Sequence, residues 1–342
     1  MRVEEMEVKI CLIGKGIVGT SFLKLLNEKN TKFKQLFGFN FIVNSIVEEN
    51  GALVRKEGIN LEEVLKIDDN FRDLPYWEKN LKPDEIFSKL DLDVCIEATP
   101  TNHKTGEPGL SHIISALNNG LDVISSNKGP FYLEYDKIRQ LANKKKCYVL
   151  YEATVASCVP ALGIKSNIEG NEIISIKAIL NGTCNFILSR MTAEGVDFSL
   201  ALKEAQELGY AEADPSLDIE GYDAAGKLVI LANDLLGWHK NITDVKVEGI
   251  SNITPQAIDL AKSDGLIIKH LAIAEKNELK VEPRLINKHS SLNIRGNLNV
   301  IELETKFAGP ITLMGRGAGG PEAASAIIND LISITKKKQN AP

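Results

Sequence analysis

The fold of the first part of the chain can be read from the segment Val8-Lys9-Ile10-Cys11-Leu12-Ile13-Gly14-Lys15-Gly16-Ile17-Val18-Gly19. It predicts a short apolar strand, a turn with the complete pattern G-x-G-x-x-G, and a helix with apolar residues at helical spacing over 17–26. These glycines let the backbone turn tightly and approach a pyrophosphate, whose charge is stabilised at the helix N-terminus. The sequence therefore predicts a dinucleotide site formed by Gly14, Gly16, Ile17, Val18 and Gly19. The alternative is a tight turn without a ligand.

Downstream of this turn, apolar runs alternate with amphipathic stretches. Strands are predicted over 39–47, 94–96, 121–124 and 148–152, and helices over 110–117 and 135–146. Such alternation is typical of a parallel sheet with helices on both faces. We therefore expect an α/β, Rossmann-type, doubly wound dinucleotide-binding domain over residues 1–155. Its charged segment 51–90 is expected to hold a helical excursion.

The pattern changes after about Cys158. The second part is predicted to contain helices over 185–193, 199–209, 224–236 and 254–266, and strands over 173–180, 267–274, 279–286 and 299–305. Helices on an antiparallel sheet form an α+β domain, so we expect a substrate and dimerisation domain over 156–308. Residues 309–342 are predicted to form a C-terminal loop and a helix that returns to the nucleotide domain. An edge of the antiparallel sheet is available for pairing, which favours a homodimer.

The composition excludes several classes of protein. The 342 residues include 40 basic and 46 acidic side chains, a net charge of −6, whereas nucleic-acid binders need a basic surface. No uncharged run approaches the roughly 18 residues that cross a bilayer, and residues 1–7 contain no apolar segment of a signal peptide. Five scattered cysteines without a C-x-x-C pair indicate neither a zinc site nor a disulfide framework. We expect a cytoplasmic protein that acts on a small molecule and binds neither nucleic acid nor membrane.

Two loops follow predicted strands of the first domain and carry polar residues. Thr99 and Thr101 follow the strand at 94–97, and Lys128 follows the strand at 121–124. Ligands bind outside the carboxyl ends of strands in a doubly wound sheet, so these residues are candidates for contact with the cofactor. The alternatives are a turn with capping threonines and an ordinary surface lysine.

The choice between NAD and NADP depends on the residues after the second strand. An NAD site usually ends this strand with an acidic residue that holds the ribose 2′-hydroxyl. Here Glu48 lies just beyond the predicted strand, and Arg55 and Lys56 follow where they could meet a 2′-phosphate. The sequence favours NADP, with NAD or dual use as the alternative.

The densest cluster of charged residues lies between Glu212 and Lys227. Asp223 and Lys227 are four residues apart and share one face of a predicted helix. They could form an exposed ion pair worth a few tenths of a kcal/mol. A lysine among carboxylates instead stays protonated and can donate a proton to a developing alkoxide.

This cluster and four other segments together resemble the signature of homoserine dehydrogenase. The four are Ser126-Asn127-Lys128-Gly129, Glu152-Ala153-Thr154-Val155, Ile179-Leu180-Asn181-Gly182-Thr183-Cys184-Asn185 and Gly315-Arg316-Gly317-Ala318-Gly319. The matches follow the family's order over nearly the whole chain. The resemblance implies NAD(P)-linked interconversion of L-aspartate 4-semialdehyde and L-homoserine, in threonine, methionine and isoleucine biosynthesis, by a short form without a regulatory domain.

The resemblance also implies roles for individual residues. Lys227 corresponds to the general acid and base, and Asp223 to the carboxylate beside it. Lys128 corresponds to the lysine between cofactor and substrate. Glu212 and Asp218 correspond to substrate-binding carboxylates.

Two further sites are implied by the same resemblance. Gly317 belongs to the cofactor-binding set. Glu152, with the backbone carbonyls of Val155, Ser157 and Val159, corresponds to a monovalent-cation site, usually for sodium.

Three positions depart from the family pattern. Ala156-Ser157-Cys158 replaces a glycine-rich stretch, Cys184 replaces a threonine or serine, and Lys15 adds a charge near the phosphates. The rival interpretations are an acylating semialdehyde dehydrogenase, with Cys158 or Cys184 as nucleophile, and a nucleotide-sensing module without catalysis. A sensor has no need of the lysine–carboxylate cluster.

Overall fold

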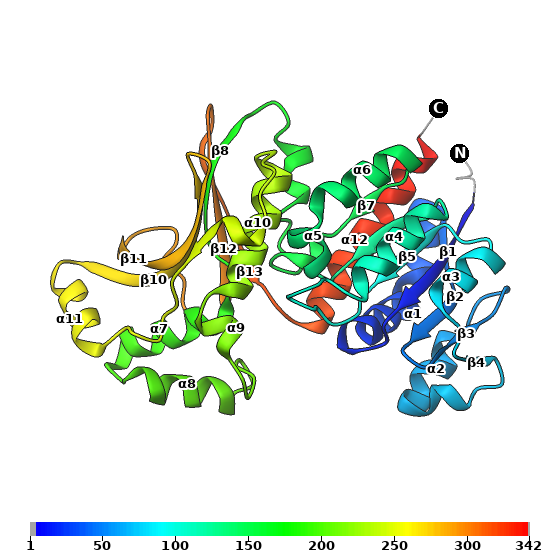
Figure 1. Cartoon of the computed structure of the whole chain (residues 1–342), viewed down its shortest axis with the longest axis horizontal. Helices are drawn as coiled ribbons and strands as arrows, with labels where there is room; N and C mark the ends of the chain where they lie inside the picture. Colours follow the sequence, from blue (N-terminus) through cyan, green and yellow to red (C-terminus); the bar gives the residue numbers. More distant parts are fainter. Residues whose placement is uncertain (1–4, 341–342) are drawn as a thin grey trace. The chain divides into compact units, whose positions relative to one another are not determined.

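The structure is a computed structural model that describes residues 5–340 (Figure 1). The chain divides into two compact units. The first contains the residues up to Thr154 together with those from Gly319 onward, and the second runs from Val155 to Ala318. Each unit has a sheet of its own.

The sheet of the first unit has seven strands in the order β4-β3-β2-β1-β5-β6-β7. Its parallel strands are β1 (Met6–Ile13), β2 (Phe39–Glu48), β5 (Val94–Glu97), β6 (Asp122–Ser125) and β7 (Val149–Leu150). The strand order reverses at β1, which pairs with β2 on one side and with β5 on the other. This is the topological switch point at which doubly wound sheets bind ligands. The predicted Rossmann-type fold is confirmed.

Helices of the first unit connect these strands. They are α1 (Ile17–Phe37), α2 (Leu61–Ile67), α3 (Pro83–Lys89), α4 (Gly109–Asn118), α5 (Gly129–Leu133) and α6 (Tyr135–Lys145). The C-terminal helix α12 (Gly320–Gln339) packs against α1 and contributes Ile327, Leu331 and Ile334 to the core of this unit. Burial of these apolar side chains, at about 25 cal/mol per Å², holds α12 on the nucleotide unit.

The segment 51–90 contains the expected helices, α2 and α3, and in addition two short strands that the sequence did not predict. It contains β3 (Gly51–Val54) and β4 (Trp77–Lys79), which extend the sheet with antiparallel pairing, in addition to α2 and α3. Strands of three or four residues give too little alternation to stand out among charged neighbours.

The second unit is built on a six-stranded sheet in the order β13-β12-β8-β10-β11-β9. Its members are β8 (Ile173–Ile179), β9 (Val245–Val247), β10 (Leu266–Glu275), β11 (Glu278–Asn287), β12 (Leu298–Thr305) and β13 (Gly309–Arg316). All pairs are antiparallel except β11 with β9, which is parallel. The predicted second sheet domain is thereby confirmed.

Helices α7 (Gly182–Glu194), α10 (Tyr222–Leu235) and α11 (Pro255–Ser263) pack against β10 of this sheet. Two shorter helices, α8 (Phe198–Glu207) and α9 (Ser216–Ile219), pack on α7. The packing brings the start of α7 and the first turns of α10 together.

The segment 309–342 divides differently from the expectation. Its first part is not a loop, because Gly309–Arg316 forms β13 at the edge of the second sheet and pairs with β12 over its whole length. The strand begins with glycine and proline, which are uncommon inside strands, so the sequence pattern does not indicate it. Its side chains alternate between half-buried and exposed.

Candidate active site

A cleft of about 800 Å³ in the first unit lies at the switch point of the sheet. Gly14, Gly16, Ile17 and Val18 line it at the end of β1. Thr99 and Thr101 line it from the loop after β5. Residues predicted from two separate loops therefore share one cavity.

Each glycine of the turn has a different steric role. Gly14 has a φ of +94°, and a Cβ there would lie 2.8 Å from the carbonyl oxygen of Ala98. A Cβ on Gly19 would lie 2.0 Å from the carbonyl oxygen of Gly14, so α1 packs directly on the turn. A Cβ on Gly16 would meet nothing, and α1 begins there without a side-chain cap. This open helix start fits the pyrophosphate of a dinucleotide.

The loop after β5 is fixed by hydrogen bonds to the buried carboxylate of Glu97, a residue for which the sequence predicted no role. Glu97 is fully buried and accepts the backbone N–H of Thr99 at 3.1 Å and its hydroxyl. Asn127 Nδ2 donates to Thr99 Oγ1 at 3.3 Å, and His112 Nδ1 lies 3.6 Å from Glu97 Oε1. The hydroxyl of Thr99 therefore fixes the shape of the loop.

Glu48 lies at the end of β2 and lines the cleft beside the glycine turn. Its Oε1 accepts the backbone N–H of Lys15, and its Oε2 lies 3.8 Å from Arg72 Nη2. Arg55 and Lys56 are not among the residues that line this cleft. Arg55 lies over the ring of Tyr76 at 5.3 Å. The acidic residue thus faces the cleft, and the two basic residues do not line it.

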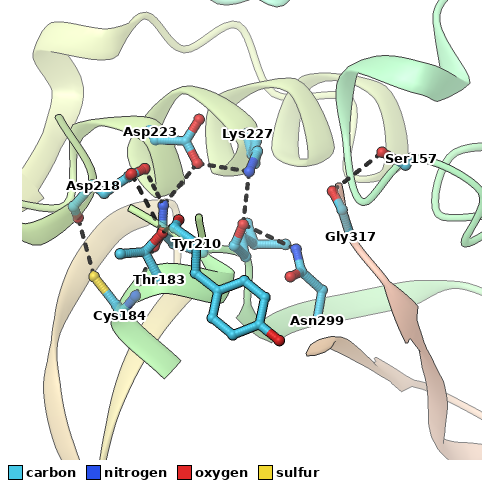
Figure 2. A network of polar contacts seen from close by, with 11 residues as sticks. Ser157, Thr183, Cys184, Tyr210, Asp218, Asp223, Lys227, Asn299 and Gly317 are labelled. Carbon is cyan, nitrogen blue, oxygen red and sulfur yellow. Dashed lines mark hydrogen bonds and ion pairs between the residues drawn. The ribbon is translucent and has the colours of Figure 1, made fainter. Parts of the chain in front are cut away.

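The second unit brings Asp223 and Lys227 together on α10 (Figure 2). Lys227 Nζ donates to Asp223 Oδ2 at 2.6 Å and to the backbone carbonyl of Leu180 at 2.8 Å. The side chains are only 11% and 9% exposed, whereas the i,i+4 pair of Lys203 and Glu207 is 73% and 66% exposed. This burial contradicts the alternative of an ordinary exposed pair.

The Leu180 carbonyl is itself fixed. Asn299 Nδ2, on β12, donates to it at 2.9 Å (Figure 2), and Asn299 is buried. Two donors on one carbonyl oxygen set the position of the Lys227 ammonium.

The first turn of α7 holds Asp218 next to this pair (Figure 2). Asn181 Nδ2 donates to Asp218 Oδ1 at 2.6 Å and to Asp223 Oδ2 at 3.0 Å. The Thr183 hydroxyl donates to the Tyr210 carbonyl at 2.7 Å and lies 3.4 Å from Asp218 Oδ2. Asn181 and Thr183 belong to the segment 179–185, and their local sequence gives no sign of this role.

Cys184 is unsuited to act as a nucleophile. Its Sγ is buried and donates to the Asp218 carbonyl at 3.1 Å. Burial, with the charges of Asp218 and Asp223, raises the pKa of the Cys184 thiol well above its ordinary value. Cys158 is exposed, with Sγ 3.8 Å from the carbonyl oxygen of Arg316. The acylating mechanism therefore finds no activated thiolate in Cys184.

Three predicted residues lie outside these two groups. Glu212 is exposed between α8 and α9, and its carbonyl accepts Gln206 Nε2 at 3.2 Å. Lys128 is half-buried at the start of α5. Gly317 belongs to the second unit, where its carbonyl accepts the Ser157 hydroxyl at 3.2 Å (Figure 2).

The residues of the expected cation site have unusual backbone geometry. Ala156 and Ser157 have φ values of +54° and +49°, a region that glycine adopts without steric cost. The backbone at Ala156 and Ser157 therefore has a conformation that suits glycine better than alanine or serine. Val155 and Val159 are buried, and the backbone N–H of Val159 donates to the backbone carbonyl oxygen of Ala156 at 3.0 Å.

Glu152, in the first unit, has a second carboxylate next to it. Its backbone N–H donates to Asp330 Oδ2 at 3.0 Å. Burial, together with the charge of Glu152, raises the pKa of Asp330 well above its ordinary value. Within residues 5–340, no group of three or more histidine, cysteine or acidic side chains is arranged to hold a metal.

None of the helices between residues 5 and 340 combines the length and the apolar character that a membrane span requires.

Family models match both units of the chain. Residues 14–152 match the model described as homoserine dehydrogenase, NAD binding domain, and residues 161–332 match the model described as homoserine dehydrogenase. A homoserine dehydrogenase of Methanocaldococcus jannaschii is 41% identical over 96% of this chain and 99% of its own length. An NAD(+)-dependent homoserine dehydrogenase of Pseudomonas canavaninivorans is 32% identical over 98% and 99%.

The solved structures agree with these matches. A hyperthermophilic archaeal homoserine dehydrogenase in complex with NADPH superposes with a TM-score of 0.84, at 27% identity over 97% of this chain and 98% of that one. From the two family models and a relative 41% identical along almost its entire length, we conclude that the chain belongs to the homoserine dehydrogenase family.

Proposed function

We propose that Lys227 is the general acid and base of the reaction that defines this family, the NAD(P)-linked interconversion of L-aspartate 4-semialdehyde and L-homoserine. The observation that carries the proposal is the buried contact of its ammonium with Asp223 and the Leu180 carbonyl. A cation held this firmly needs no reorganisation when negative charge develops on the substrate oxygen.

When bound, the nicotinamide supplies or accepts the hydride. In the reductive direction, Lys227 donates a proton to the alkoxide that forms from the aldehyde oxygen. In the oxidative direction, the same nitrogen takes the hydroxyl proton of homoserine. Asp223 keeps the ammonium in place throughout. We propose that Lys128 adds supporting positive charge.

The substrate carries an α-ammonium and a carboxylate, which need partners of opposite charge. We propose that Asp218 binds the α-ammonium, because its carboxylate shares the Asn181 amide with Asp223, the partner of Lys227. Glu212 is exposed on the adjacent loop, and we propose it as the second substrate-binding carboxylate.

The cofactor is NAD(P), bound at the glycine turn and the Thr99–Thr101 loop. The expected preference for NADP rested on Arg55 and Lys56, which do not line the cleft. Glu48 does, and an acidic residue there suits the ribose hydroxyls of NAD. We therefore propose NAD as the preferred nucleotide, with NADP as the second choice. Gly317 remains a proposed contact.

We propose, from the family pattern, that Glu152 with the carbonyls of Val155, Ser157 and Val159 binds a monovalent cation, sodium. A hard cation prefers such oxygen ligands. Melting temperature and turnover are compared in sodium chloride and in a bulky organic cation at equal ionic strength. Both should fall without sodium, and Glu152→Gln should remove the difference. Identical values in the two salts would contradict the site.

Two proposals from the sequence complete the assignment. We propose a homodimer formed through the edge of the second sheet. We also propose a cytoplasmic location, supported by five cysteines that form no disulfide in the described part of the chain.

The test of the reaction is the absorbance of reduced nicotinamide formed with homoserine. Lys227→Ala should lower kcat by about 10²- to 10⁴-fold, the usual contribution of a general acid–base group, with little change in nucleotide affinity. Lys203→Ala removes a lysine from an exposed i,i+4 pair and should leave kcat unchanged. A Lys227→Ala enzyme that keeps more than about a third of wild-type kcat would refute the assignment.

A further inference from the structure

Asn181 lies between the two carboxylates next to Lys227 and contacts both. Its Nδ2 donates to Asp218 Oδ1 at 2.6 Å and to Asp223 Oδ2 at 3.0 Å. The same Asp223 oxygen accepts the Lys227 ammonium at 2.6 Å. Asn181 and Asp223 are both buried. One neutral side chain thus joins two acidic residues and, through Asp223, the general acid and base.

The helix that follows Asn181 fixes the direction of this amide. Asn181 is the N-cap of α7, and its Oδ1 accepts the backbone N–H of Cys184 at 2.9 Å. A flipped amide would turn its NH₂ toward that N–H and its oxygen toward two carboxylates, which loses all three hydrogen bonds. The start of α7 therefore aims the donor at the acidic pair.

The charges explain why a neutral donor is useful here. Asp218 and Asp223 share one partner at short range, and their mutual repulsion would push Asp223 away from Lys227. An amide satisfies both carboxylates without adding charge, whereas a second lysine would compete with Lys227 for Asp223. We infer that Asn181 is a positioning residue, which holds Asp218 and Asp223 so that Lys227 keeps its contact with the Leu180 carbonyl. The inference rests on the proposed role of Lys227.

Two substitutions separate this role from helix capping. Asn181→Ser keeps a capping oxygen and removes the amide donor. Asn181→Asp keeps the cap and the shape but turns a third anionic oxygen toward the acidic pair. We measure kcat, the KM for homoserine, the pH profile of kcat and the melting temperature.

The serine variant should lose about tenfold in kcat and the aspartate variant about a hundredfold, as for other residues that orient a catalytic group. The KM should change less than kcat. In the aspartate variant, the acid limb of the kcat profile should move to higher pH, because added negative charge favours protonation of its neighbours. Both variants should melt within a few degrees of the wild type, since each keeps the cap.

Asp197→Ala is the matched control. Asp197 caps α8 by accepting the backbone N–H of Leu200 at 2.9 Å, and it is exposed and outside the site. This variant should melt a few degrees lower and keep the wild-type kcat and pH profile.

Serine and aspartate variants with wild-type kcat and pH profile would overturn the inference. A loss of activity that only follows the loss of stability, on the scale that Asp197→Ala sets, would overturn it too. Wild-type turnover is measured in the same assay, because its absence would refute the proposed reaction itself, whereas an active wild type matched by both variants refutes only the role of Asn181.

Discussion

At the scale of single residues, Glu48 occupies the point where the two nucleotides differ. Its carboxylate accepts the Lys15 backbone N–H, so it is held at the glycine turn. The Lys15 ammonium lies 4.6 Å from the centre of the Phe71 ring, and Arg72 lies 3.8 Å from the same carboxylate. A 2′-phosphate at this point would lie near the negative charge of Glu48 and the positive charges of Lys15 and Arg72. Removing the anion should therefore favour NADP.

We predict that the wild-type enzyme has a higher kcat/KM with NAD than with NADP. Glu48→Gln should raise the ratio of NADP to NAD use by about 10- to 100-fold, since a carboxylate a few ångströms from a phosphate costs about 1–4 kcal/mol. The measurement is initial rates with homoserine and each nucleotide.

The double variant Arg55→Gln with Lys56→Gln is the comparison. It should leave the nucleotide preference unchanged, because neither residue lines the cleft. If this variant loses NADP use and Glu48→Gln has no effect, then Arg55 and Lys56 hold the 2′-phosphate. That result would contradict the proposal that Glu48 sets the nucleotide preference.

The site residues that could be predicted from the sequence are those that lie close to one another along the chain. The glycine turn, and Asp223 with Lys227, recur at short intervals that reflect one turn or one helical face. Asn181 and Asn299 meet this group only through folding, because they lie about 40 to 120 residues from their partners. Glu48, Arg55 and Lys56 all follow the second strand in the sequence, but the sequence does not show that only Glu48 of the three lines the cleft.

At the scale of elements, β10 carries a buried lysine that ties three segments together. Lys269 Nζ donates to Asn185 Oδ1 at 2.7 Å and to Ser189 Oγ at 3.3 Å, both on α7, and to the Ile294 carbonyl. Burial, with the nearby charge of Arg295, lowers the pKa of Lys269 to about 8. In the unfolded chain the value returns to 10.5.

This difference predicts how stability depends on pH. Between pH 8 and 10.5 the unfolded state keeps a proton on Lys269 that the folded state has lost. The free energy of unfolding therefore gains up to about 1.4 kcal/mol per pH unit from this group as the pH rises. Below pH 8 the cost of burying the charge is present in full.

Urea unfolding at several pH values from 7.5 to 10 tests the prediction. Lys269→Met removes the titration, so the stability of the wild type relative to this variant should increase with pH. Lys177→Met, an exposed lysine on neighbouring β8, should show no such trend. If the difference in the free energy of unfolding between wild type and Lys269→Met is the same at every pH, the predicted titration of Lys269 is wrong.

Elements with long amphipathic or apolar patterns were predictable, and short or interrupted ones were not. The alternation of strands and helices gave the doubly wound sheet. The helix α1 extends to Phe37, although its predicted end lies near residue 26. The second half of the helix is hard to predict because it is charged and only Phe33 and Phe37 in it pack on the core. Strand β13 does not stand out in the sequence because Gly309, Pro310 and Gly315 interrupt its alternation of apolar and polar residues.

At the scale of the whole molecule, the strands at sheet edges differ greatly in length. The edge strands β4, β7 and β9 have three, two and three residues. Strand β13 has eight, with exposed Thr312 and Met314. Long edges invite pairing with another chain, whereas short ones do not. In the part of the chain described, β13 is thus the edge that would serve an isologous dimer.

We predict a homodimer in sedimentation equilibrium, formed by β13 of two copies. The double variant Thr312→Lys with Met314→Lys should shift it toward monomer, because charged side chains on an edge strand oppose pairing. Val245→Lys, on the short edge strand β9, should leave the dimer intact and controls for the added charge. A wild-type monomer would refute the dimer, and a dimer that survives the β13 variant would place the interface on another surface. Circular dichroism confirms that the variants are folded, so that a shift in mass reports on the edge alone.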